Sequence, residues 1–200
     1  MFQSITSPAK AESLYVAFEN AAKQEKSLFD DVKKLNDLET KEEELYVQIL
    51  REGKEYNKAV VKKTDEAVAN VDEREKVLKH EREVLEKAQE EIKPVPSDVD
   101  KIEDKKLQKA AKEVEKVYKN RYESFQKMNE KYMELLTMEK ELYGKFKVKE
   151  TKLKEIGEKV KTINALNKEL QKEKEKFNRY TKEYNEGKIA FYKEAKMKVK

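Results

Sequence analysis

The stretch Glu90–Lys106, "EEIKPVPSDVDKIEDKK", decides how this chain folds. It holds two of the chain's three prolines, Pro94 and Pro96, within a run that is otherwise charged and apolar. Proline cannot donate a helix hydrogen bond, and it pushes the preceding residue out of the helical region. Ser97 followed by Asp100 fits a capping box, so we expect a new helix with Ser97 as its N-cap. So short a connection makes two helices antiparallel neighbours, and the prolines therefore predict a hairpin bend.

On both sides of this bend, apolar residues recur every three or four positions, which is the spacing of one helix face. The pattern predicts four helices, over residues 8–52, 55–93, 98–144 and 150–198. The other ends fall at residues that favour helix starts or helix breaks, namely Ser7-Pro8, Gly53, Gly144, Val148 and Thr151. Gly157 and Gly187 are expected to weaken the last helix without breaking it.

Four helices of similar length with short turns predict an all-α fold, an elongated antiparallel up-and-down four-helix bundle that forms one domain over residues 1–200. A long parallel coiled coil is the first alternative. It would make the prolines a defect, and adjacent apolar pairs such as Val60-Val61 widen the stripe beyond a two-stranded seam. A three-helix, spectrin-like arrangement is the second alternative. It would need one glycine break to be continuous helix, which leaves helices of very unequal length.

The composition is that of a charged helical protein, with 44% charged and 37% hydrophobic residues, no Cys and no Trp. Residues 1–100 carry 17 basic and 24 acidic side chains, whereas residues 101–200 carry 29 and 18. Only five of the 46 basic residues are Arg, the residue best suited to bidentate phosphate and base contacts. We therefore expect no nucleic-acid partner. The lack of Cys excludes disulfides, thiol catalysis and thiolate metal sites.

The sequence holds few residues that could support catalysis. His80 is the only histidine and lies off the apolar stripe, so we expect an exposed side chain. A di-iron site in a helical bundle needs two Glu-x-x-His motifs, and a phosphate-binding loop needs clustered glycines. The many carboxylates mostly neighbour Lys at helical spacing, which indicates ion pairs. We expect no enzyme, no catalytic residue, no metal and no cofactor.

Three stretches carry a family resemblance: "LNDLETKEEELYVQILREGKEYN" (35–57), "DEAVANVDEREKVLKHEREVLEKAQEEIK" (65–93) and "KFNRYTKEYNEGKIAFYKEA" (176–195). They resemble the YkyA-like family of Gram-positive bacteria, named "putative cell-wall binding lipoprotein". The resemblance implies an all-helical extracytoplasmic protein that is membrane-anchored through an acylated Cys or associated with the cell wall. The sequence contains no such Cys, so we expect the lipid anchor to be absent from it. Without a leader the location would be cytoplasmic.

The resemblance favours a non-enzymatic surface protein that binds anionic cell-wall polymer or peptidoglycan as a monomer, with the membrane reached only through the lipid anchor. Lysines concentrate in "GKFKVKETKLKE", and tyrosines such as Tyr122 and Tyr192 could be exposed and stack on sugars. The candidate polymer-contact residues are Lys145, Lys147, Lys149, Lys152, Lys154 and Tyr192. The alternatives are a protein–protein interaction module and a membrane-surface binding helical protein. The second of these would need a dimer with a concave, lysine-rich face.

Overall fold

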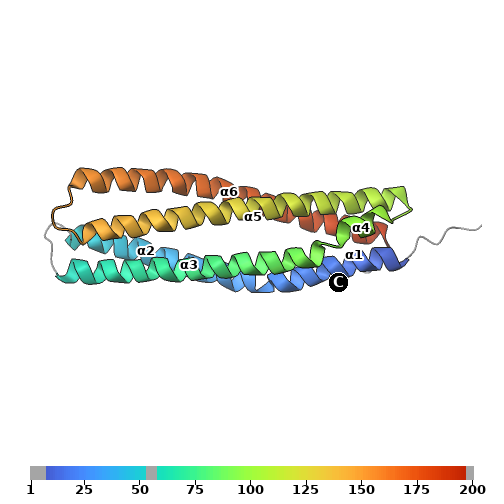
Figure 1. Ribbon diagram of the computed structural model, residues 1–200, viewed down its shortest axis with the longest axis horizontal. Coiled ribbons are helices and arrows are strands. Elements are labelled where there is room, and N and C mark those ends of the chain that lie inside the picture. Colours follow the sequence, from blue (N-terminus) through green and yellow to red (C-terminus); the bar gives the residue numbers. More distant parts are fainter. Residues whose placement is uncertain (1–7, 53–57, 197–200) are drawn as a thin grey trace, which may run out of the picture. The chain divides into compact units, whose positions relative to one another are not determined.

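The computed structural model describes residues 8–52 and 58–196, and every regular element within them is a helix (Figure 1). The elements are α1 (Pro8–Gln24), the 3₁₀ turn η1 (Glu25–Ser27), α2 (Leu28–Glu52), α3 (Lys58–Ile92), α4 (Val95–Asp100), α5 (Lys105–Phe146) and α6 (Leu153–Glu194). The all-α prediction is therefore confirmed. No described helix is long and apolar enough to cross a bilayer.

The chain forms two compact units that share three of these helices. Unit 1 consists of Met1–Ser27, Glu83–Gln126 and Glu173–Lys200, and unit 2 consists of Leu28–Arg82 and Lys127–Lys172. Helices α3, α5 and α6 each begin in one unit and continue into the other. The interpretation of residues 1–200 as one domain stays a prediction.

Inside each unit, side-chain contacts show that neighbouring helices are antiparallel, because higher-numbered residues of one pair with lower-numbered residues of the next. In unit 2, α2 and α3 pair in this way at Gln48 with Lys63, Leu38 with Asn70 and Asp31 with His80. Helices α5 and α6 do so at Glu141 with Lys159 and Lys131 with Glu169, and in unit 1 at Arg121 with Thr181 and Lys106 with Glu194. The predicted up-and-down order of four helical segments is confirmed.

The proline bend contains a helix that the sequence did not predict. Helix α3 ends at Ile92, and the two prolines start α4, a helix of 6 residues whose N-cap Pro94 makes no side-chain capping bond. Ser97 lies inside α4, so its predicted role as an N-cap is wrong. The true cap of α5 is Asp104, whose Oδ1 accepts hydrogen bonds from the backbone N–H groups of Lys106 and Leu107, both at 2.9 Å.

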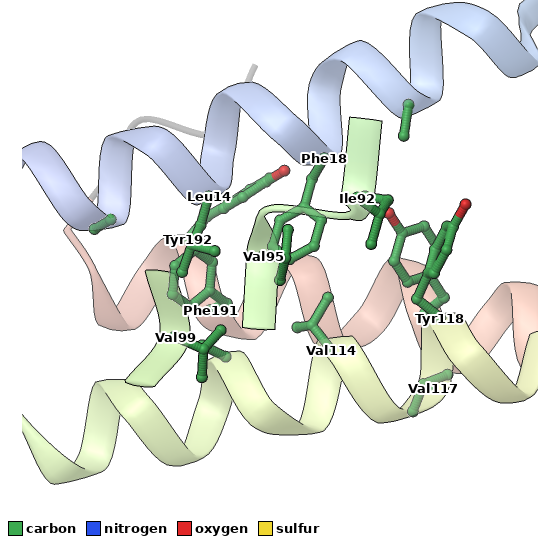
Figure 2. Packing of buried hydrophobic residues seen from close by; sticks show 14 of the residues in the cluster. Leu14, Phe18, Ile92, Val95, Val99, Val114, Val117, Tyr118, Phe191 and Tyr192 are labelled. Atoms are coloured by element: carbon green, nitrogen blue, oxygen red, sulfur yellow. The ribbon is translucent and has the colours of Figure 1, made fainter. Parts of the chain in front are cut away.

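Helix α4 is held by its apolar side chains, and this explains why the bend is more than a turn. Val95 and Val99 are fully buried in the unit 1 core, where Figure 2 shows them between α1 and α5 with Leu14 and Phe18. Asp98 of α4 also accepts a 2.7 Å hydrogen bond from the Ser13 hydroxyl of α1. The predicted start of the third helix at residue 98 is therefore wrong, because burying this valine pair favours a separate short helix.

The other predicted boundaries are close to the observed ones. The first predicted helix, 8–52, is interrupted by η1, and the last begins at Leu153 rather than at 150. Helix α5 continues through Gly144 to Phe146, and α6 continues through Gly157 and Gly187. The expected starts or breaks at Ser7 and Gly53 lie outside the described residues.

Each unit has its own hydrophobic core. In unit 1 the core is rich in aromatic rings that pack edge to face, including Phe18 against Phe191 with ring centroids 6.1 Å apart. In unit 2 it consists mainly of aliphatic residues, among them Ile49, Val71, Leu78, Leu136 and Ile163. These residues are the apolar stripes of the sequence, so burial of one helix face against the others holds each unit together.

Candidate functional site

The lysine-rich segment predicted from the sequence forms the end of α5, the connection to α6 and the first turn of α6, all in unit 2. Helix α5 ends in two tight backbone bonds, from Lys147 N–H to the Gly144 carbonyl and from Val148 N–H to the Lys145 carbonyl, both 3.2 Å. The carbonyl of Lys152 accepts the first bond of α6, from Glu155 N–H at 3.0 Å. We call residues 145–154 the lysine turn.

The structure separates the five lysines of this turn into two groups. Lys145 Nζ lies 3.5 Å from the Glu155 carboxylate, and Lys147 pairs with Asp65 of α3. Lys149, Lys152 and Lys154 are exposed, and none of them forms an ion pair within the described part of the chain. Only these last three lysines present charges that are not already matched by a described carboxylate.

Tyr192 is not part of this surface. It belongs to unit 1, only 5% of it is exposed, and its hydroxyl donates a 2.9 Å hydrogen bond to Glu19. Its ring also packs edge-on against Tyr15, with centroids 4.9 Å apart. The prediction that Tyr192 is an exposed aromatic is therefore wrong, because this residue completes the unit 1 core. Tyr122 is half-buried against the same core.

The lysine turn also exposes two apolar side chains that the sequence analysis did not propose as contact residues. Val148 is 52% exposed and Leu153 is 86% exposed. Leu153 continues the spacing of the α6 stripe, so the pattern placed it in the core. Leu153 is exposed because α6 begins at this residue, so no earlier turn of the helix lies there to hold the side chain against the core. Alternating lysines and apolar residues in "KVKETKLK" were the available signal.

His80 is exposed, as predicted, and it has a partner that the sequence did not reveal. Its Nδ1 lies 2.7 Å from Oδ2 of Asp31, and half of the imidazole side chain is accessible to solvent. Within the described ranges 8–52 and 58–196, no three His, Cys, Asp or Glu side chains are placed to hold a metal ion. The lysine turn is therefore the candidate site with the clearest ligand chemistry, which is the attraction of anions.

Comparison with known proteins shows which family this chain belongs to. A family model described as "YkyA: Putative cell-wall binding lipoprotein" matches residues 9–194. The "Uncharacterized lipoprotein YkyA" of Bacillus subtilis (strain 168) is 28% identical over 189 residues, which are 94% of this chain and 85% of that protein. A crystal structure of a conserved protein of unknown function from Staphylococcus aureus has the same fold, with a TM-score of 0.82, 20% identity and 96% of each chain covered. Because the family model matches almost the whole chain, this protein belongs to the YkyA family.

Proposed function

We propose that this protein is a non-enzymatic protein of the cell surface that binds anionic cell-wall polymer through the lysine turn. The observation that carries the proposal is the set of three exposed lysines, Lys149, Lys152 and Lys154, without an ion-pair partner among the described residues. The family description, which names cell-wall binding and lipoproteins, supports both the ligand class and an extracytoplasmic location, either anchored at the membrane or associated with the wall.

The physical basis of this binding is simple charge attraction. An ammonium group is a compact, strongly hydrated charge, and it attracts phosphate or carboxylate without demanding one geometry. Three such groups within six residues favour a flexible polymer with repeated negative charges over a single small anion. Since exposed charges are screened over about 8 Å at physiological ionic strength, this binding should weaken strongly with added salt.

A sedimentation assay with purified cell-wall material tests the proposal. We expect the protein to be retained at low salt and released at high salt, and the triple variant K149E/K152E/K154E to lose retention at low salt. The matched control is K105E/K109E/K116E, which makes the same charge change at exposed lysines of α5 in unit 1. Equal loss of retention in both variants would show that net charge, rather than the lysine turn, governs binding.

A second candidate function, binding to an anionic membrane surface, is favoured by the two exposed apolar residues of the same turn. Val148 and Leu153 stand beside the lysines and could enter the interfacial region of a bilayer. The variant V148S/L153S separates the two functions, because it removes the apolar contacts and keeps every lysine. Loss of binding to phosphatidylglycerol vesicles with unchanged binding to wall material would support a membrane contact in addition to the polymer contact.

A further inference from the structure

Unit 2 buries a group of charged side chains that the proposed function does not use. Arg74 of α3 is 2% exposed and Glu139 of α5 is 6% exposed, and the two form an ion pair between Arg74 Nη2 and Glu139 Oε2. Arg74 Nε also donates a 3.0 Å hydrogen bond to Asn70 Oδ1. Asn70 in turn donates to the backbone carbonyl of Leu38 at 2.8 Å, which links α3 to α2.

Helix α2 adds two more carboxylates to this group. Glu39 accepts a hydrogen bond from the Tyr132 hydroxyl, and Glu42 accepts one from the Tyr143 hydroxyl. Both tyrosines belong to α5 and are buried, at 3% and 0% exposed. We call the resulting set the unit 2 polar core, and it consists of Glu39, Glu42, Asn70, Arg74, Tyr132, Glu139 and Tyr143.

The unit 2 polar core contains more negative than positive groups. The carboxylates of Glu42 and Glu39 act on Glu139, and the guanidinium of Arg74 pairs with Glu139. A buried carboxylate with further negative charge nearby is unfavourable in a medium of low polarity, even when it is paired with one cation. The group can lower this cost by binding a proton.

Glu139 is the member best placed to take that proton. Burial raises its pKa to about 7, the Arg74 guanidinium acts in the opposite direction, and the carboxylates of Glu42 and Glu39 add to the rise. Burial also raises the pKa values of Tyr132 and Tyr143 well above the usual tyrosine range, with Glu39 and Glu42 contributing respectively. The two tyrosines therefore stay neutral and donate to the carboxylates of α2, and Tyr132 also forms a hydrogen bond with Arg74.

Among the residues that the structure describes, Arg74 is the cation recorded as acting on Glu139, and the charged groups of the other elements in unit 2 have other partners. From α2, Tyr46 is a neutral phenol whose pKa is raised by burial and by Glu42. From α3, Lys63 donates to Gln48. From α6, Ile163 and Leu170 are apolar, and Lys159 pairs with the exposed Glu141. On α5, Lys140 pairs with Asp72 and Glu75 at the surface.

We propose that the unit 2 polar core is a proton-binding site, and that protonation of Glu139 stabilises the packing of α2 against α3 and α5. The native state holds this proton more tightly than the unfolded chain, in which a glutamate has its ordinary pKa of 4.5. The stabilisation is therefore complete below about pH 4.5 and is lost as the pH rises through about 7. This contribution therefore favours the folded state of unit 2 in mildly acidic conditions.

Carbon-13 NMR of the glutamate carboxyl groups in the full chain tests the site directly. We expect one carboxyl resonance to titrate near neutral pH and to disappear in the Glu139→Gln variant. A Glu139 resonance that titrates with the exposed glutamates would overturn the proposal. The Glu42→Gln variant gives a second test in a chain that keeps the Arg74–Glu139 pair. Removing one neighbouring carboxylate should lower the pKa of Glu139, and an unchanged titration would contradict the proposed coupling.

Chemical unfolding at several pH values tests the effect on stability. Between about pH 5 and pH 7, this group should change the unfolding equilibrium constant by up to about tenfold per pH unit. The Glu139→Gln variant should lack this contribution, whereas the control Glu141→Gln, at an exposed position on the same helix, should keep it. If Glu139→Gln retained the wild-type pH dependence, the proposal would be wrong. If that variant did not fold, the NMR titration and the Glu42→Gln variant would decide.

Discussion

Unit 1 and unit 2 each bury one arginine, and the surroundings of the two arginines differ in charge. In unit 1, Arg121 donates to Glu25 at 2.7 Å and to Thr181 at 2.9 Å, and its guanidinium carbon lies 4.9 Å from the centroid of the Phe177 ring. In unit 2, Arg74 binds Glu139 and Asn70, and two further carboxylates from α2 act on Glu139.

The comparison indicates that burial and nearby charge act together on a buried carboxyl group, since burial is the largest cause of the raised pKa of Glu139 and the carboxylates of Glu42 and Glu39 add to it. Unit 1 offers two cations, Arg121 and Lys188, beside the two carboxylates Glu19 and Glu25. Lys188 also lies 4.7 Å from the centroid of the Tyr184 ring, whose electron-rich face attracts a cation. In unit 2, Arg74 is the cation that acts on Glu139, and Glu42 and Glu39 add negative charge. The two units therefore bury the same residue type in surroundings of different charge.

The largest effect should come from removing the arginine of unit 2. Arg74→Met leaves Glu139 buried without a cation, and breaking such a pair costs about 3–5 kcal/mol of unfolding free energy. Part of this loss should be recovered in acid, because protonation removes the unpaired charge. Urea unfolding at about pH 5 and pH 8 measures both values.

The same change in unit 1 should cost less. Arg121→Met also breaks an ion pair, but the Glu25 side chain is 15% exposed against 7% for Glu139, so the remaining carboxylate can reach water more easily. We expect a loss of about 2 kcal/mol that changes little with pH. A larger loss for Arg121→Met than for Arg74→Met would reverse the comparison.

The valines of α4 provide a test of unit 1 that involves no charge. Val99→Ala removes two buried methyl groups from the unit 1 core, so we expect a loss of about 2 kcal/mol that is the same in acid and at neutral pH. Val148→Ala in the lysine turn is the matched control, because that valine is exposed and its truncation should cost less than about 0.5 kcal/mol. Equal losses would mean that α4 contributes no packing.

The smallest effect should come from the aromatic face over Arg121. Phe177→Leu keeps an apolar side chain and removes the cation–π contact, which is worth about 0.5–1 kcal/mol at a partly exposed site. Double-mutant cycles with Arg121→Met should assign this loss to the pair, because the two side chains are in contact. Strict additivity of the two losses would contradict a direct interaction.

The proline bend, the helix phases and the position of the lysine turn could be predicted from the sequence because they depend on local rules. Pro94 and Pro96 end a helix in any context, and the three-to-four spacing fixes which face is buried. The short helix α4 could not be predicted, because its formation depends on the burial of Val95 and Val99 in the unit 1 core. Leu153 shows the reverse case. Its spacing is that of a core residue, but it is the first residue of α6 and its side chain is exposed.

The buried pair of Arg74 and Glu139 leaves a signal in the sequence that periodicity alone cannot interpret. Arg74 stands on the apolar stripe of α3 between Val71 and Leu78, and Glu139 stands on that of α5 between Leu135 and Leu142. A charged residue at a stripe position is buried and needs a partner. The partner, however, lies 65 residues away along the chain, so the pair and the carboxylates near it are visible only in the folded chain.

Native-state hydrogen exchange of the wild-type chain, measured across pH and corrected for the intrinsic exchange rates, tests the central claim most directly. The amides of α2 and of the unit 2 part of α3 should lose protection as the pH rises from about 5.5 to 7.5, while those of α1 and α4 in unit 1 keep theirs. An equal change in both units, or constant protection in unit 2, would contradict the claim that the buried Glu139 makes unit 2 the more sensitive to pH.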